Sequence, residues 1–262
     1  MDLINYNIQN AVATVTLNRA DKHNALNPAM ISALQETFVQ AAQDSKVQVV
    51  VVRGEGISFC AGADLHWMKQ SIDMHKDENL TSALALYDMY HAIYTCPKPV
   101  LGAIHGNAFG GGVGMIACMD VAIMHKDAIL SLSELKLGLI PSTIAPFLLR
   151  KVGMKHLKYY GLCSQRISAV QGQSIGLVHH LVDNKPDLDT EIARHVDMFL
   201  ELSPQAIARY KKMCEDVQFL SLSEARGVTS EEIADIRTTE EAQEGLRAFF
   251  EKRKPNWKKF LA

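Results

Sequence analysis

The sequence predicts an α/β domain that is followed by a helical extension. Three nearly continuous apolar runs alternate with amphipathic segments, and the strand signals stop beyond Pro186. Buried strands that alternate with helices are typical of a largely parallel sheet covered by helices. With 262 residues, of which 48% are hydrophobic and 21% charged, the chain can bury a sizeable core.

The individual elements follow from periodicity. Residues 11–17 alternate apolar and small polar side chains, which predicts a strand, and Asn27-Pro28 opens an amphipathic helix. Further strands are predicted at 47–52, 99–104 and 120–124, and helices at roughly 65–94, 111–118 and 143–152. Four C-terminal helices are predicted at 187–202, 204–216, 221–234 and 239–253. Phe249, Phe250 and Trp257 are too few to form a separate core, so we expect them to pack on the main domain or on a neighbouring subunit.

Composition excludes several classes of function. A formal net charge of -2 without a long basic run gives no reason to expect nucleic acid. The five scattered cysteines form no C-x-x-C pair, which indicates a reducing compartment and argues against a thiolate zinc site. The acidic start Met1-Asp2-Leu3 is unlike a secretory signal, and His105 interrupts the longest uncharged stretch. We therefore expect a soluble cytoplasmic protein with no membrane or nucleic-acid partner.

Two glycine-containing turns stand out. Residues 58–65 follow the strand at 47–52, residues 106–114 follow the strand at 99–104, and each turn leads into a helix. The first turn of a helix leaves N–H groups unpaired at the positive end of the helix dipole, and glycine lets a ligand approach the main chain. Two such turns aimed at one point would make a two-donor oxyanion hole. Alternatively, the glycines at 110–112 only allow close packing of a helix on a sheet. Neither turn matches a dinucleotide or P-loop motif.

Motifs along most of the chain resemble the crotonase (enoyl-CoA hydratase/isomerase) family. They occur in the family's order between about residues 10 and 255, and comprise Asn18-Arg19, Asn24-Ala25-Leu26, Phe59-Cys60-Ala61-Gly62-Ala63-Asp64-Leu65, Gly106-x-Ala108-x-Gly110-Gly111-Gly112, Leu137-Gly138-Leu139-Ile140-Pro141, Arg166-Ile167-Ser168-Ala169, Gly176-Leu177-Val178 and Phe250-Glu251-Lys252-Arg253-Lys254. The resemblance implies a crotonase-like spiral of β-β-α repeats with a C-terminal helical extension. It also implies a core at 1–200 that carries the active site, and a helical segment at 201–262 that covers CoA and forms trimers.

The resemblance also assigns roles to individual residues. The N–H groups of Ala63 and Gly111 would form the oxyanion hole. The substrate's CoA moiety and thioester would lie along Lys22, His23, Ala25, Ala61, Asp64, Leu65, His66 and Gly110. Phe249 and Lys252 would reach CoA from the C-terminal helix, often across a subunit boundary. The implied partner is an acyl-CoA thioester, the implied assembly is a homotrimer or a hexamer of two trimers, and no metal or separate cofactor is expected.

The candidate acid–base residue is Glu134. Crotonases with two glutamates carry one of them three residues after the oxyanion-hole glycine, but here that position is Gly114. The other family glutamate matches Glu134, whose apolar neighbours should desolvate the carboxylate and raise its pKa. Judged without the resemblance, Glu134 could instead be a helix-start carboxylate or part of a structural ion pair.

A single glutamate fits two reactions. In hydration Glu134 would handle both the proton and the water, and the motifs resemble a bacterial subgroup of methylglutaconyl-CoA-type hydratases from branched-chain acyl degradation. In Δ3,Δ2-enoyl-CoA isomerisation one carboxylate would move a proton between C2 and C4. We favour the hydratase. A protein that binds acyl-CoA without catalysis is a third hypothesis, against which the presence of Glu134 argues.

Three further patterns are weaker. The sequence G-x-S-x-G at 172–176 would need a preceding strand to be a nucleophile elbow, and residues 166–171 instead predict the start of a helix capped by Ser168. Asp64 is expected to cap the helix that follows it rather than to act as a base. The ten histidines include no H-E-x-x-H motif, and His105 is expected to be structural.

Overall fold

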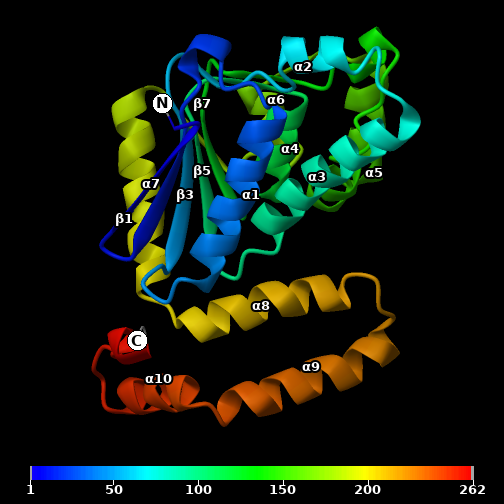
Figure 1. Cartoon of the computed structure of the whole chain (residues 1–262). Helices are drawn as coiled ribbons and strands as arrows, with labels where there is room; N and C mark the ends of the chain where they lie inside the picture. The colour runs from blue at the N-terminus through cyan, green and yellow to red at the C-terminus, as the bar shows by residue number, and fades with distance from the viewer. Residues whose placement is uncertain (1, 261–262) are drawn as a thin grey trace.

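The computed structural model describes residues 2–260, apart from the side chain of Lys258, and consists of two sheets surrounded by helices (Figure 1). The large sheet has the strand order β1-β2-β3-β5-β7-β10, formed by Ile4–Gln9, Val12–Leu17, Val49–Gly54, Val100–Ile104, Val121–His125 and His180–Val182. Its strands are parallel except for the β1–β2 hairpin. The small sheet has the order β4-β6-β8-β9, formed by Ser58–Cys60, Asn107–Phe109, Ile129–Ser131 and Arg166–Ser168.

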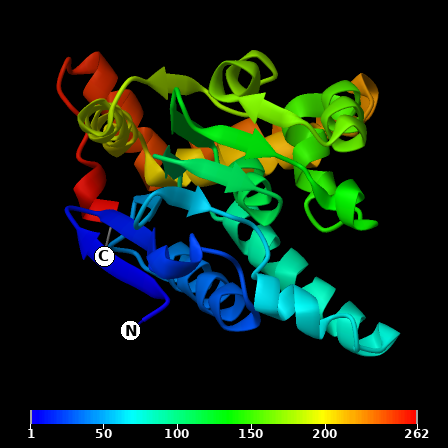
Figure 2. The same cartoon turned by 90° about the horizontal axis from the view of Figure 1, so that it is seen from above.

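The chain repeats a β-β-α unit. In each repeat the first strand joins the large sheet, the second joins the small sheet, and a helical segment follows. The helical segments are α2 and α3 (Leu65–Gln70 and Lys76–Tyr94), α4 (Gly111–Cys118), and η2 with α5 (Glu134–Leu137 and Ala145–Cys163). Viewed from above, the repeats advance in one direction from blue to yellow-green, so that the chain forms a spiral (Figure 2). The predicted fold class is confirmed.

Strand alternation divides the core between the two faces of the large sheet. Val50 and Val52 of β3 point into the main core, which is shared with α1 (Pro28–Gln43) and α3, as seen to the right of the sheet in Figure 1. Val49 and Val51 point to the other face, where α7 (Lys185–Leu200) packs. Because every second residue of a strand faces the same side, a strand that is apolar throughout can serve two helical layers.

Two predicted helices differ from the observed ones. The pattern at 65–94 is two helices, because His75 and Glu78 form a capping box that starts α3 after a break at residues 71–75. The prediction at 143–152 covers only the first part of α5. Gly153 in α5 has φ 75°, which is outside the helical region, and it marks a kink one residue after the end of the predicted helix.

The short strands were difficult to predict. The four strands of the small sheet have three residues each, which is too short for alternation to identify them. One of them corrects the prediction of a helix start at 166–171, because Arg166–Ser168 is β9 and only then does α6 (Ala169–Ser174) begin, capped by Ser168. Ser174 ends that helix and does not follow a strand, so the G-x-S-x-G sequence is not a nucleophile elbow.

The C-terminal helices form a layer at one end of the molecule (Figure 1). After α7 come α8 (Pro204–Val217), α9 (Leu222–Arg237), α10 (Glu240–Phe250) and the short η3 (Trp257–Phe260). The Trp257 indole donates a hydrogen bond to the Glu201 carbonyl at 2.8 Å, whereas Phe249 and Phe250 are 76% and 78% exposed. The division at 200/201 falls between α7 and α8 and stays a prediction, and its outer ends, Met1, Leu261 and Ala262, lie outside the described residues. None of the helices within residues 2–260 has the length and apolar character needed to cross a bilayer.

Candidate functional site

The first glycine turn is held by pairing with the loop before α1. The Leu26 N–H donates to the Gly62 carbonyl at 2.7 Å, and the Asp64 N–H donates to the Leu26 carbonyl at 2.8 Å. These two bonds form a parallel bridge that places Ala63 opposite Leu26. Gly62 has φ 88°, a conformation that favours glycine. The sequence motifs at 24–26 and 61–65 therefore meet in one structure.

The second turn lies against the first. The Gly110 N–H donates to the Ser131 carbonyl at 2.9 Å, and Gly110 has φ 45° at the start of α4. A Cβ atom built on Gly62 would lie 3.6 Å from the Gly111 nitrogen, and one built on Gly112 would lie 2.5 Å from the Cys60 carbonyl oxygen. Only glycine at 112 allows this close contact, so the packing explanation for the glycines at 110–112 holds for Gly112.

Ala63 and Gly111 border the same cavity of about 470 Å³. Among the hydrogen bonds found within residues 2–260, none is donated by the main-chain N–H of either residue. Two residues of adjoining turns whose N–H groups are unpaired among the described residues thus border one cavity, as the donors of an oxyanion hole would have to. Their role as its donors stays a prediction.

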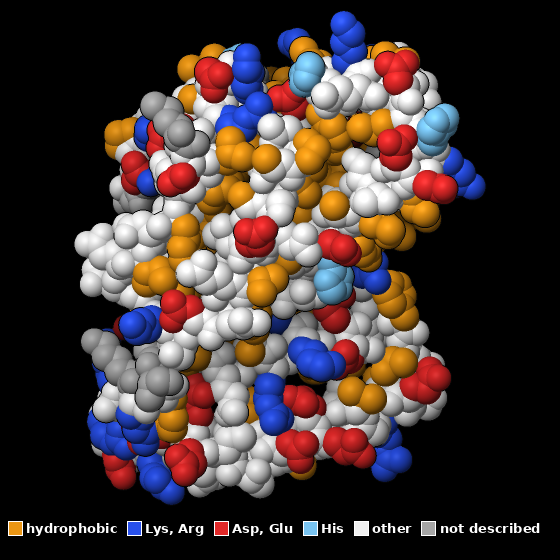
Figure 3. Space-filling model, in the orientation of Figure 1, with side chains coloured by type: hydrophobic (Ala, Val, Ile, Leu, Met, Phe, Trp, Pro, Cys, Tyr) orange, Lys and Arg blue, Asp and Glu red, His pale blue; other side chains and the backbone are white. Residues whose placement is uncertain are grey.

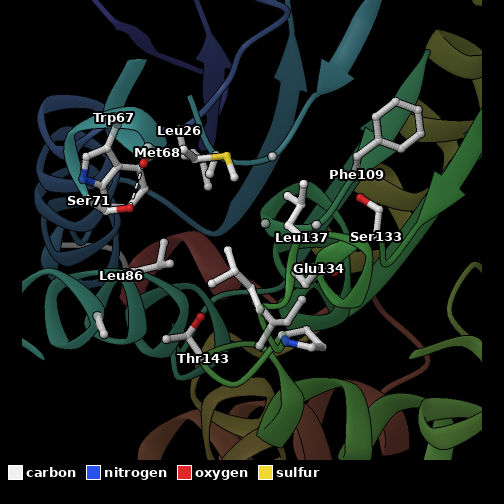
Figure 4. A pocket seen from close by; sticks show the side chains of 18 of the residues that line it. Leu26, Trp67, Met68, Ser71, Leu86, Phe109, Ser133, Glu134, Leu137 and Thr143 are labelled. Atoms are coloured by element: carbon white, nitrogen blue, oxygen red, sulfur yellow. Dashed lines mark hydrogen bonds between the residues drawn. The ribbon is translucent and has the colours of Figure 1, made fainter. Parts of the chain in front are cut away.

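Glu134 borders this cavity as well (Figure 4). It is half-buried at the start of η2, and a Cβ built on Gly110 would lie 3.0 Å from its Oε1 atom. Its Oε2 atom is buried and has no hydrogen-bond partner within the described residues. Desolvation by burial raises the pKa of the Glu134 carboxyl, which outweighs the main-chain hydrogen bonds that lower it. Glu134 therefore borders the cavity with one carboxylate oxygen unpartnered and with no ion pair among the described residues, which is contrary to the ion-pair alternative.

The position of a second carboxylate is filled by apolar atoms. A Cβ built on Gly114 would lie 2.2 Å from Ile144 Cγ2 and 3.2 Å from Tyr90 Cε1. Ile144 is 2% exposed, and it precedes α5 directly. The sequence has no acidic side chain at position 114, and the packing of Ile144 and Tyr90 has closed the space that such a side chain would need.

The remaining cavity wall is mostly apolar. Leu86 and Tyr90 come from α3, Trp67 and Met68 from α2, and the segment before α5 supplies Leu137, Leu139, Ile140, Pro141, Thr143 and Ile144. Apolar side chains gather between α1, α2 and α3 on the face shown in Figure 3. Among the described lining residues, Glu134 carries the only charge and no Lys, Arg or His is present. Sequence patterns gave no sign of Tyr90 at this site, since it resembles an ordinary core residue.

A second cavity of about 770 Å³ adjoins the first and shares Ala61, Ala63, Leu65 and Trp67 with it. It brings together seven of the ten residues predicted to bind the substrate or its CoA moiety, namely Lys22, His23, Ala25, Ala61, Asp64, Leu65 and His66, while Gly110 borders the first cavity and Phe249 and Lys252 border neither. Arg19, which was not predicted, adds a further positive charge.

Asp64 is a helix cap, as expected. Its carboxylate accepts hydrogen bonds from the main-chain N–H groups of His66 at 2.8 Å and Trp67 at 3.3 Å, and it pairs with Arg19 at 2.8 Å. The hydrogen bond from Arg19 is the main cause that holds its pKa below the ordinary value. An ionised, fully engaged carboxylate of this kind is a poor general base.

Phe249 and Lys252 are not brought to either cavity within one chain. Phe249 lies in the last turn of α10 and Lys252 follows that helix, at the end of the molecule opposite α2 (Figure 1). Their predicted contact with CoA thus requires a neighbouring subunit and stays a prediction.

One cluster of potential metal ligands lies elsewhere. The ligand atoms of His180, Glu191 and His195 lie within 4.8 Å of one another, on β10 and α7, which contribute to neither cavity. The two Glu191 carboxylate oxygens already accept hydrogen bonds from Arg194 at 2.7 and 3.0 Å. We therefore assign no metal to this cluster. His105 contacts the Gly56 carbonyl at 3.1 Å, which fits a structural role.

Comparison with known proteins identifies the class. The chain belongs to the enoyl-CoA hydratase/isomerase family, whose model matches residues 7–260. A crystal structure of an enoyl-CoA hydratase from Shewanella pealeana ATCC 700345 is 36% identical with a TM-score of 0.94, covering 98% of this chain and 96% of that chain. An enoyl-CoA hydratase structure from Mycobacterium smegmatis is 30% identical with a TM-score of 0.92, covering 98% and 100%. The bacillaene synthase dehydratase PksH of Bacillus subtilis (strain 168) is 28% identical over 96% of both chains.

Proposed function

We propose that this protein reversibly hydrates a 2-enoyl-CoA thioester, with Glu134 as its only acid–base residue. The observation that carries the proposal is that Glu134 borders the same cavity as Ala63 and Gly111, and that its buried Oε2 atom has no partner within residues 2–260. The names of the Shewanella and Mycobacterium structures support hydration. The dehydratase name of PksH supports the same chemistry in the reverse direction.

The proposed reaction needs two proton transfers, one from water to Glu134 and one from Glu134 to the α-carbon. Ionised Glu134 takes a proton from water while the water oxygen bonds to the β-carbon, and the π electrons shift so that negative charge develops on the thioester oxygen. The N–H groups of Ala63 and Gly111 donate hydrogen bonds to that oxygen. Loss of one such donor typically costs about 2.7–4 kcal/mol of transition-state stabilisation. Protonated Glu134 then delivers the proton to the α-carbon, and no separate cofactor takes part.

Δ3,Δ2-enoyl-CoA isomerisation is the second candidate function. It is favoured by the filled space beside Gly114, because a proton shuttle needs one carboxylate and no activated water. Incubation with crotonyl-CoA and with a trans-3-enoyl-CoA separates the possibilities. Loss of the conjugated enoyl absorbance indicates a hydratase, its appearance from the 3-enoyl compound indicates an isomerase, and no change with either indicates a protein that only binds acyl-CoA.

The charge of the cavity wall predicts a preference for neutral acyl groups. The terminal carboxylate of 3-methylglutaconyl-CoA would enter an apolar space in which the described residues supply no positive charge and Glu134 is negative. Burying an unpaired charge is strongly unfavourable. We expect kcat/KM for crotonyl-CoA to exceed that for 3-methylglutaconyl-CoA by about 100-fold, which corresponds to about 2.7 kcal/mol. Equal values measured with the purified protein would contradict a neutral acyl site.

The raised pKa of Glu134 predicts the pH dependence. The general base must be ionised, so kcat/KM should rise with pH through a pKa above the ordinary value of 4.5. Folding stability should change in the opposite direction. A carboxyl whose pKa is raised in the folded state stabilises the fold below its unfolded pKa, and this contribution is lost as pH rises through the folded pKa. A pH–rate profile with no acidic limb above pH 4.5 would contradict this account of Glu134.

We also infer that the chain assembles as a homotrimer or as a hexamer of two trimers. Leu246, Phe249 and Phe250 of α10 are strongly exposed, and apolar side chains of this size are usually covered. Such an assembly would bring Phe249 and Lys252 to a neighbour's CoA. Light scattering that gives a monomer mass would contradict it.

The five unpaired cysteines support a cytoplasmic location.

A further inference from the structure

The first turn of α4 has little of its own to hold it in place. Four of the five residues at 110–114 are glycine, and glycine has the largest backbone freedom of any residue. The position of the Gly111 N–H must therefore be fixed by contacts from outside the turn. On the proposed function, a displacement of this donor would weaken its hydrogen bond to the thioester oxygen.

Tyr90 supplies one such contact. Its hydroxyl donates a hydrogen bond to the Gly111 carbonyl at 3.0 Å. Within residues 2–260 this is the only side-chain hydrogen bond to the main chain of residues 110–114. The turn also packs on the phenol directly, since a Cβ built on Gly111 would lie 2.8 Å from the Tyr90 oxygen.

The phenol is itself rigidly held. Tyr90 is 0% exposed, its ring packs on Phe147 with 6.0 Å between the ring centroids, and it comes from the long helix α3. Desolvation by burial and nearby acidic groups, including Glu134, raise its pKa, so the hydroxyl keeps its proton and remains a donor. Although Tyr90 borders the cavity, it exposes no surface to a substrate. Its direct link to the proposed oxyanion hole is the hydrogen bond to Gly111.

We propose that Tyr90 is a positioning residue that holds the first turn of α4, so that the Gly111 N–H points at the thioester oxygen. This inference rests on the proposed function. It differs from a merely structural role for Tyr90, because it predicts a change in the polarisation of the bound carbonyl as well as a change in stability.

The test compares Tyr90→Phe with Tyr94→Phe. Tyr94 is one turn further along α3, also packs on Phe147, and donates its hydroxyl to the Glu215 carboxylate on α8, away from the cavity. Each change therefore removes one phenol hydrogen bond from the same helix. Tyr90→Phe should lower kcat by about 10-fold to 100-fold, the effect of a small displacement of a catalytic group, while KM changes by less than about threefold. Tyr94→Phe should leave kcat within about twofold of the wild type.

Infrared spectroscopy gives the second measurement. The carbonyl stretching frequency of a bound, isotope-labelled butyryl-CoA thioester should move toward its solution value in Tyr90→Phe and stay unchanged in Tyr94→Phe. Replacing Tyr90 with 4-aminophenylalanine, a weaker donor of similar shape, should give values between those of tyrosine and phenylalanine. This variant also serves if the phenylalanine variant does not fold. A wild-type frequency with the weaker or missing donor would overturn the inference, whereas a wild-type protein that neither binds nor converts CoA thioesters would overturn the proposed function itself.

Discussion

Replacing Glu134 by glutamine is expected to lower kcat by roughly 10²–10⁴, the usual effect of removing a general acid–base group. The amide keeps the size of the side chain but can neither accept the proton from water nor return it to the α-carbon. The affinity for the CoA thioester should change little, because the second cavity and the main-chain donors are untouched. Stopped-flow measurement of crotonyl-CoA hydration and calorimetric titration with butyryl-CoA would give the two quantities.

The same substitution should make the folded protein more stable at neutral pH. Burial raises the pKa of Glu134, which means that the ionised carboxylate costs stability above that pKa, and glutamine removes this cost. Glu231→Gln on α9 is the matched control, since Glu231 is exposed and lines neither cavity. If Glu134→Gln retains the wild-type kcat, Glu134 is not the acid–base residue, and if the variant is less stable than the wild type, the ionised carboxylate does not cost the folded protein stability.

The larger part of this arrangement could be predicted from the sequence. Apolar runs such as 47–52 are long enough to identify a buried strand, and cap residues such as Asn27 fix where a helix begins. The two glycine turns followed from their place between a predicted strand and a predicted helix, Glu134 followed from resemblance in short motifs, and the structure brings all three to one cavity. The sequence also predicted that residue 114 could not supply a carboxylate.

The rest depends on tertiary contacts that leave no local signal. Tyr90 lies on a helix at a spacing that is ordinary for core residues, and nothing near it in sequence indicates that its hydroxyl meets Gly111. The sequence also does not show that Ile144 contacts position 114, where a Cβ atom would lie 2.2 Å from its Cγ2 atom. Phe249 and Lys252 cannot be judged from one chain, because a residue that acts in a neighbouring subunit is remote from the site in its own.

Gly114→Ala is expected to destabilise the protein even though alanine favours helices. Alanine gains up to about 1 kcal/mol over glycine within a helix. Its methyl group would overlap Ile144, which lies 2.2 Å away, and overpacking a buried site typically costs about 1–3 kcal/mol. We expect the steric cost to exceed the propensity gain, so that urea denaturation shows a lower free energy of unfolding. A more stable Gly114→Ala variant would show that the contact between α4 and Ile144 relaxes easily.

Gly114→Glu extends this test from stability to chemistry. Alone it should fail to fold or lose several kcal/mol, since it adds a buried carboxylate to the steric overlap. Ile144→Ala relieves the overlap. The double variant should therefore lose about 1–3 kcal/mol less free energy of unfolding than the sum of the losses in the two single variants. Ile144→Ala by itself is the control, because it opens the space without adding a carboxylate. If the folded double variant hydrates crotonyl-CoA faster than this control, the site can still use a second carboxylate, and the apolar contact between Ile144 and α4 is what restricts the present protein to one. If the double variant folds and gains nothing, the geometry around Glu134 alone sets the rate.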